Sequence, residues 1–443
     1  MSTPVLGSNN RQGLVAPNIR LGLGAIYDQA SGRSDRTPPG ILVGPTHQAF
    51  PMSTVLPLSG NVPSERTAGL NTVEEILEDL KAGRMVIIMD DEDRENEGDL
   101  IMAAELATPE AVAFMIRHAS GIICVPMEEN RLLSLDLPQM VANNSELHRT
   151  AFTVSVDLIS GTTTGVSSSD RAATIRGLAD ANAKAADFAR PGHIFPLRAR
   201  RGGVLVRTGH TEAAVDLCRL AGLQPVGVIC EVMNEDGSMA RRPDLQAFAQ
   251  RHGLKVGTIA DLIRHRLRNE RSIERVSEQI VQTELGEFRL FAYEDRVSQE
   301  VHLALTKGCL DQDSPLVRVH VADPLRDLLG IRADPRAWTL RDAMERVASA
   351  GNGVIVILRD RESSGDLLGS VRALASPGGA DPGGASGAMP AAQRSEVLKT
   401  FGIGAQILKD LGVKRMRVLS APKQIHGIAA FGLEIDSYVG EDA

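Results

Sequence analysis

The sequence predicts a layered α/β fold arranged in two domains. Apolar runs at 85–89, 121–126 and 226–230 have the length of buried strands. Amphipathic stretches of helical period alternate with these runs, which is the pattern of an α/β domain. At 443 residues the chain is too long for one ordinary core, so two domains and further segments are expected.

Composition narrows the class of protein. Apolar residues make up 43% and charged residues 23%, as in soluble globular proteins. The net charge of −8 argues against a general nucleic-acid binder, so an anionic ligand would need local basic residues. We expect no membrane span and no secretory signal, and therefore a cytoplasmic protein. The four cysteines form no C-x-x-C pair, which fits free thiols in a reducing compartment.

The first ordered element is expected shortly after an extension. Residues 1–66 are rich in Gly, Pro, Ser and Asn without a sustained period, so we expect them to be largely disordered or draped over the body. Thr72 can cap a helix together with Glu75, three residues on. Apolar residues then fall on one helical face, and Gly83 is expected to end the helix.

A dense acidic segment, Asp90–Asp99, follows the strand expected at 85–89. It holds seven carboxylates and Arg94, and crowded carboxylates repel each other unless a cation, an arginine or protonation relieves them. A solvated acidic loop is the simplest interpretation. The segment ends a buried strand, however, where α/β proteins place ligands, and a hard cation such as Mg²⁺ would suit it. An EF-hand does not fit, because Asn96 stands where that loop needs glycine.

The middle of the chain continues the alternation. A helix is expected from Thr108-Pro109 to Gly121, and strands at 121–126 and 152–158. Residues 161–171 are rich in Gly, Ser and Thr, which suits a phosphate or sugar contact and equally suits a linker. A rigid turn at 190–196 would carry His193, although an isolated histidine is more often structural than catalytic.

The segment 202–212 is more informative. A glycine pair and a short strand lead through Arg207 to a helix that starts at Gly209-His210-Thr211. A helix N-terminus flanked by arginine is a ready anion site. His210 would there be a metal ligand or proton carrier, or would simply cap its own helix. The strand at 226–230 then ends at Glu231, and helical patterns follow from Pro243 and within 256–267.

These segments, in this order, closely resemble 3,4-dihydroxy-2-butanone 4-phosphate synthase over residues 67–271. The resemblance rests on the unbroken run Asp90–Asp99, the hydroxyl-rich loop, and the motifs at 190–197, 209–212 and 230–231. That family belongs to the riboflavin pathway. It converts ribulose 5-phosphate into 3,4-dihydroxy-2-butanone 4-phosphate and formate.

The resemblance implies a set of site residues and a cofactor. Mg²⁺ or Mn²⁺ would be held by Glu95 and His210, and His193 and Glu231 would be required for catalysis. Contacts to ribulose 5-phosphate would come from Arg94, Glu95, Asp99, Arg207, Thr208, Gly209, His210, Thr211 and Glu231. The family is homodimeric, so a homodimer is expected. A divalent cation can stabilise an enediolate while carboxylates and histidines move protons, which agrees with the residues themselves.

A second, smaller α/β unit is predicted over residues 272–443. Strands are expected at 316–321 and 353–358, and helices at 339–350 and from Phe401. A glycine-rich segment at 376–387 is expected to be a flexible loop. This half resembles the GTP cyclohydrolase II domain that often follows the synthase.

The polar positions of this second half depart from the cyclohydrolase family. His320 is followed by Val321-Ala322-Asp323 instead of Ser-Glu-Cys, and no cysteine lies beyond Cys309. Segments 361–365 and 397–401 have also lost the family's polar residues. We therefore expect neither zinc nor GTP hydrolysis, because that reaction needs a zinc ion on three thiolates. Two alternatives are a bifunctional enzyme that also hydrolyses GTP and a non-catalytic regulator or scaffold.

Overall fold

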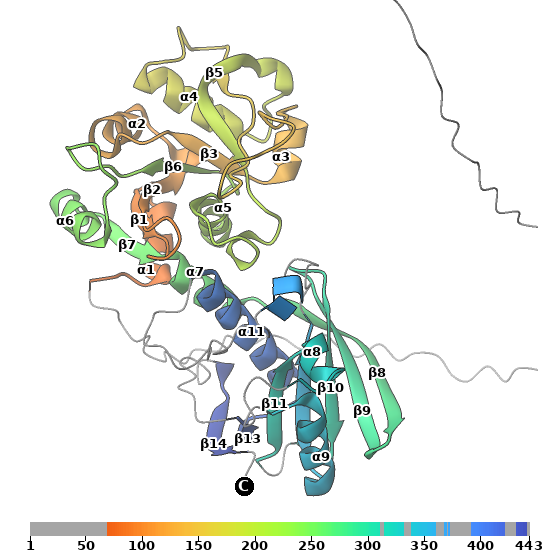
Figure 1. The fold of residues 1–443 in the computed structure, drawn as a ribbon. Helices are drawn as coiled ribbons and strands as arrows, with labels where there is room; N and C mark the ends of the chain where they lie inside the picture. Colours follow the sequence, from red (N-terminus) through yellow and green to blue (C-terminus); the bar gives the residue numbers. More distant parts are fainter. Residues whose placement is uncertain are drawn as a thin grey trace, which may run out of the picture. The chain divides into compact units, whose positions relative to one another are not determined.

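The computed structural model describes residues 69–310, 314–331, 338–359, 367–369, 371–372, 391–420 and 431–440. The predicted extension at 1–66, the glycine-rich segment at 376–387 and residues 361–365 lie outside these ranges. The described chain forms two seven-stranded sheets, each with helices against it (Figure 1). In these ranges no helix is both long and apolar enough to cross a bilayer. The predicted two-part α/β architecture is confirmed.

The first sheet has the order β4-β5-β3-β6-β2-β1-β7 and mixes parallel with antiparallel pairs. Its strands are β1 (Val86–Met89), β2 (Gly98–Ala103), β3 (Cys124–Met127), β4 (Val156–Leu158), β5 (Phe188–Arg198), β6 (Gly227–Glu231) and β7 (Lys255–Thr258). Both faces of β1 and β2 are buried, which explains why these strands are apolar apart from Asp99.

Helices cover both faces of this sheet. One core joins Val86, Ile88 and Ile101 to the apolar sides of α1 (Val73–Lys81), α5 (His210–Leu220) and α7 (Ile259–Asn269). The other core joins Ile87 and Leu100 to α2 (Pro109–Phe114), α4 (Ser168–Ala179) and α6 (Arg242–His252). A short helix, α3 (Glu129–Ser134), adds Leu132 to the second core.

Several predicted boundaries are confirmed and others are wrong. Thr72 and Glu75 form the predicted capping box of α1, and Gly83 adopts φ +72° just beyond the helix. The helix at 109–119 ends at Ser120, with φ +67°, rather than at Gly121, so β3 starts three residues later than predicted. The segment 190–196 is part of strand β5 and not a turn. Residues 203–205 form a 3₁₀ turn where a short strand was predicted.

The second sheet has the order β14-β13-β11-β12-β10-β9-β8. Its strands are β8 (Ile273–Thr283), β9 (Gly286–Asp295), β10 (Val301–Lys307), β11 (Leu316–Val321), β12 (Gly353–Leu358), β13 (Arg415–Leu419) and β14 (Glu434–Val439). Its described helices are α8 (Pro324–Asp327), α9 (Leu340–Ala350) and α11 (Ala391–Asp410). The strands predicted at 316–321 and 353–358 are confirmed. Strand β8 was missed, because it is an edge strand with a mostly exposed side-chain pattern.

Candidate active site

The acidic segment folds into a tight turn between β1 and β2, and Asp90 holds it together. The Asp90 carboxylate accepts hydrogen bonds from the backbone N–H groups of Glu95 (3.0 Å) and Glu97 (2.8 Å). The Arg94 guanidinium lies 2.9 Å from both the Asp90 and the Glu95 carboxylate. The segment is therefore an ordered, hydrogen-bonded turn rather than a solvated acidic loop.

His210, the first residue of α5, reaches this turn from the other side of the fold. Its Nε2 lies 3.1 Å from the carbonyl oxygen of Ile88, which can only accept a hydrogen bond, so Nε2 carries a hydrogen. Nδ1 therefore faces the carboxylates of Glu95 (3.7 Å) and Asp99 (3.8 Å). The strand–turn–strand unit and the α5 N-terminus thus bring together the two residues predicted to bind metal.

The geometry and the donor types fit a divalent cation. Asp90, Glu95 and His210 each offer one ligand atom, and these atoms lie within 4.8 Å of one another. A cation about 2.1 Å from each ligand can bridge such separations. Oδ1 of Asp99 is buried and, within the described chain, has no hydrogen-bond partner, which is costly unless a ligand satisfies it. Asp90 was missed as a candidate ligand; its only sequence signal was its place directly after the strand.

Burial and mutual repulsion govern the protonation of this cluster. Burial raises the pKa of Asp99 to about 7, although His210 opposes the shift. Burial would lower the pKa of His210, but the Asp99 and Glu95 carboxylates raise it to about 9. Burial also opposes ionisation of Glu95, but His210 and Arg94 lower its pKa to about 2. In the metal-free protein a proton on Nδ1 of His210 therefore balances the carboxylates.

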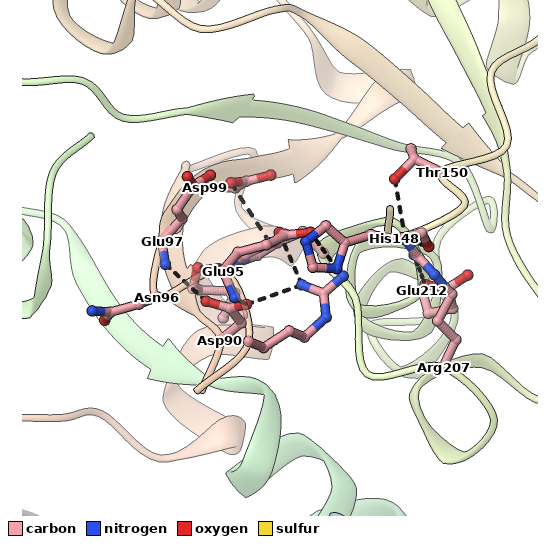
Figure 2. A network of polar contacts seen from close by, with 12 residues as sticks. Asp90, Glu95, Asn96, Glu97, Asp99, His148, Thr150, Arg207 and Glu212 are labelled. Atoms are coloured by element: carbon pink, nitrogen blue, oxygen red, sulfur yellow. Dashed lines mark hydrogen bonds and ion pairs between the residues drawn. The ribbon is translucent and has the colours of Figure 1, made fainter. Parts of the chain in front are cut away.

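Arg207 precedes α5 and is held by a buried carboxylate. Its Nη1 lies 2.7 Å from Oε2 of Glu212, whose side chain is only 1% exposed. Its Nη2 donates to the carbonyl oxygen of His148 (3.1 Å) and to Oγ1 of Thr150 (3.2 Å) (Figure 2). Sequence reasoning singled out Arg207 but missed Glu212 as its partner, because only the helix geometry brings the two side chains together.

The other predicted substrate residues around α5 lie at its first turn. Gly209 is the N-cap and offers no side-chain oxygen to the first N–H groups of the helix. A Cβ at Gly209 would meet Nη1 of Arg207 at 2.4 Å, so the glycine makes room for that guanidinium. Thr208 lies just before the cap, and Thr211 is buried in the first turn.

The two predicted catalytic residues lie on β5 and β6. Nδ1 of His193 lies 2.7 Å from Oδ2 of Asp157, and Oδ1 of the same carboxylate accepts the His193 backbone N–H at 2.9 Å. Glu231 pairs with Asp99 in the β2–β6 register, and its Oε2 accepts the backbone N–H of Ile122 at 2.8 Å. Asp157 was missed by sequence reasoning; an acid inside an apolar strand run was the signal.

The hydroxyl-rich loop is held by one of its own residues. Oδ2 of Asp170 accepts hydrogen bonds from N and Oγ1 of Thr163 and from the backbone N–H of Gly165. A Cβ at Gly165 would meet Oδ2 of Asp157 at 2.0 Å and Nδ1 of His193 at 2.8 Å. The loop therefore lies directly against the His193–Asp157 pair, and it is neither a free linker nor remote from the site.

The second sheet keeps a buried histidine where the resemblance to a cyclohydrolase was strongest. His320 is fully buried, and its Nε2 lies 2.9 Å from both carboxylate oxygens of Asp327. Burial lowers the pKa of His320, although Asp327 opposes the shift. Asp323 accepts the backbone N–H groups of Leu325 and Arg326 and so caps α8. Asp323 and Asp327 thus stabilise the turn after β11.

Comparisons with known proteins cover both halves. A family model described as 3,4-dihydroxy-2-butanone 4-phosphate synthase matches residues 74–265, and one described as GTP cyclohydrolase II matches residues 274–440. The chain is 53% identical to the 3,4-dihydroxy-2-butanone 4-phosphate synthase of Pseudomonas aeruginosa over 371 residues, which is 84% of this chain and 99% of that protein.

Two further relatives share both halves. The riboflavin biosynthesis protein RibBA of Aquifex aeolicus is 46% identical over 372 residues, which is 82% of this chain and 91% of that protein. The crystal structure of RibBX, a two-domain 3,4-dihydroxy-2-butanone 4-phosphate synthase from A. baumannii, is 42% identical with a TM-score of 0.70. It covers 83% of this chain and 99% of its own.

Proposed function

Since the chain belongs to the 3,4-dihydroxy-2-butanone 4-phosphate synthase family and has that activity in riboflavin biosynthesis, we propose that the Glu95–His210 cluster is its catalytic centre. The substrate is ribulose 5-phosphate, and the products are 3,4-dihydroxy-2-butanone 4-phosphate and formate. The main observation behind this assignment is that Nδ1 of His210 faces the Glu95 carboxylate at 3.7 Å. Beside them lies Oδ1 of Asp99, which has no hydrogen-bond partner within the described chain.

The metal in this proposal is Mg²⁺ or Mn²⁺, held by Glu95 and His210 with Asp90 beside them. Carboxylate oxygens suit both ions, and the orientation of His210 by the Ile88 carbonyl leaves Nδ1 to face the ion. When bound, the cation supplies Lewis-acid stabilisation of negative charge on sugar oxygens. Asp99, with its pKa near 7, can hold or release a proton at the same place.

Proton transfer at the other end of the site is assigned to His193 and Glu231. Asp157 accepts the hydrogen on Nδ1 of His193, so it fixes the tautomer and leaves Nε2 as the basic nitrogen. The His193 side chain is 47% exposed, so a substrate can reach it. Glu231, beside Asp99 in the register, offers a second carboxylate for a proton from the sugar carbons.

Synthase activity is assigned to residues 67–271, and residues 272–443 are proposed not to hydrolyse GTP. The boundary falls where α7 ends at Asn269 and β8 of the second sheet begins at Ile273. The chain has no cysteine beyond Cys309, and a zinc site of three thiolates cannot form without them. This supports a monofunctional synthase over a bifunctional enzyme.

A homodimer is part of the same proposal. Leu147, Ile159 and Val166, on loops near the site, are 87%, 56% and 51% exposed in the single chain. Exposed apolar side chains of this size around one region indicate a protein-binding surface. A second copy of the chain is the partner that the family resemblance supports.

The test is formate release from ribulose 5-phosphate by the purified full-length chain with Mg²⁺. Glu95→Gln should abolish release while the chain stays folded, because a proposed metal ligand is lost and the hydrogen bonds of Asp90 still hold the turn. Glu92→Gln is the matched control, since Glu92 is an exposed carboxylate in the same turn. EDTA should stop the wild type reversibly. Turnover by Glu95→Gln near that of Glu92→Gln in limiting Mg²⁺ would show that the metal lies elsewhere.

A further inference from the structure

The catalytic region is rich in carboxylates, and most of its arginines are already neutralised. Arg94 lies 2.9 Å from the Asp90 and Glu95 carboxylates. Arg207 lies 2.7 Å from the Glu212 carboxylate. A phosphorylated sugar brings further negative charge, and these two guanidiniums already share their charge with protein carboxylates. An arginine near the reaction centre that pairs with no protein carboxylate is therefore a candidate for binding the negative charge of the substrate.

Arg171 is such a cation. Its Nε is buried and, among residues that the structure describes, finds no hydrogen-bond acceptor. The same described ranges hold no carboxylate within ion-pair distance of its guanidinium. A buried N–H without an acceptor costs free energy, and an acceptor oxygen of a ligand would remove that cost. Burial accordingly lowers the pKa of Arg171.

Arg171 stands close to the groups assigned to proton transfer. It lies in the first turn of α4, directly after the loop that Asp170 ties together. Gly165 in that loop comes so close to the His193–Asp157 pair that a Cβ there would clash with both side chains. The negative charge of Asp157 acts on the Arg171 guanidinium from nearby. Helix α4 also packs against β4 and β5, the strands that carry Asp157 and His193, so Arg171 lies on the side of the site where His193 is held.

We propose that Arg171 is a further catalytic residue, whose guanidinium contacts an anionic oxygen of the substrate beside His193. This deepens the proposed function and rests on it. Two oxygens share this chemistry: a phosphate oxygen, which is charged from the start, and a sugar oxygen that becomes an enediolate during the reaction. A donor already in place for a developing charge stabilises the transition state more than the bound substrate.

The experiment compares Arg171→Ala and Arg171→Lys with Arg176→Ala in the full-length chain. Arg176 lies on the same helix but is exposed and bonds to the backbone carbonyl of Ala107, so its removal should leave kcat and KM unchanged. Arg171→Ala should lose about 100-fold or more in kcat/KM. Its melting temperature should be unchanged or raised, because no protein partner of the guanidinium is lost. Added guanidinium chloride at low concentration should partly restore Arg171→Ala and leave Arg176→Ala unaffected.

Whether the loss of kcat/KM falls on kcat or on KM shows which substrate oxygen Arg171 contacts. A loss confined to kcat indicates the enediolate oxygen, which is charged only during the reaction. A rise in KM, together with weaker inhibition by inorganic phosphate, indicates the phosphate. Arg171→Lys should retain part of the activity in either case. The proposal would be overturned if Arg171→Ala kept more than half of the wild-type kcat/KM. It would also be overturned if the loss of activity came with a lower melting temperature and was not reversed by added guanidinium. Failure of the wild type itself to release formate would instead refute the proposed function.

Discussion

Replacing Arg207 by methionine should destabilise the protein as well as weaken substrate binding. The Arg207 side chain is 18% exposed, and that of its partner Glu212 is 1% exposed, with 2.7 Å between Nη1 and Oε2. Methionine keeps much of the side-chain volume and removes the charge. It leaves the Glu212 carboxylate buried, with the backbone N–H of Arg200 (3.0 Å) as a remaining donor. It also releases the loop at His148 and Thr150 that Arg207 holds.

The magnitude follows from the burial of Glu212. Removing one partner of a buried ion pair typically costs about 3–5 kcal/mol, because the other charge stays buried without compensation. At about 2–4 °C per kcal/mol, the melting temperature should fall by roughly 6–20 °C. Burial already raises the pKa of Glu212 against the pull of Arg207. In the variant the folded-state pKa should rise further, so the deficit should be full at neutral pH and shrink as the pH falls towards the ordinary pKa of glutamate.

Thermal and urea unfolding of three variants and the wild type separates this effect from catalysis. Arg207→Met/Glu212→Gln should recover much of the stability, since the buried charge is gone, while its KM for ribulose 5-phosphate stays high. Arg198→Met is the control, because Arg198 pairs at 2.8 Å with Glu129, whose side chain is 57% exposed. That variant should lose less than about 1 kcal/mol. The reasoning fails if Arg207→Met is no less stable than Arg198→Met, or if Glu212→Gln brings no recovery.

Three other predictions concern the metal, the proton carrier and the second half. Because the pKa of His210 is about 9 without metal and a ligand nitrogen must be deprotonated, Mg²⁺ affinity should rise with pH up to about 9. Calorimetry should detect proton release on binding, and equal affinity at pH 7 and 9 would contradict the ligand assignment. Asp157→Asn should lower kcat by about 10²–10⁴-fold with little change in KM, since the tautomer of His193 is no longer fixed; unchanged kcat would remove Asp157 from the mechanism. With Zn²⁺ and GTP the purified protein should form no ring-opened pyrimidine, and steady product with tightly bound stoichiometric zinc would refute this.

Local signals in the sequence predicted local structure well. The capping box of Thr72 and Glu75 and the stripe of α1 require only nearby residues, and both are confirmed. The strand β5 was mistaken for a turn because Pro191 and Pro196 suggest a break, whereas pairing with β4 and β3 overrides that preference. Pairing between strands that are distant in the sequence cannot be predicted from local residue propensities alone.

The site was predictable mainly through family resemblance. Glu95 and His210 are far apart in the sequence, and only the antiparallel β1–β2 turn and the start of α5 bring them face to face. Their supporting residues were harder to find. Asp157 reaches His193 through the β4–β5 register, and Glu212 reaches Arg207 across the first turn of α5. These contacts depend on strand register and side-chain direction, which spacing in the sequence does not specify.

The second half keeps the sheet of its family while several polar positions differ from it. Strand β12 keeps four consecutive buried residues, Gly353–Val356, and β11 keeps its parallel register beside it, so the apolar pattern that specifies the sheet is intact. Asp323, which stands where the family has a cysteine, caps α8, and Asp327 pairs with Nε2 of the buried His320. A buried histidine with a carboxylate partner stabilises its surroundings without any metal. Polar positions at the strand ends can thus change while the buried core of the second sheet, which specifies its fold, stays the same.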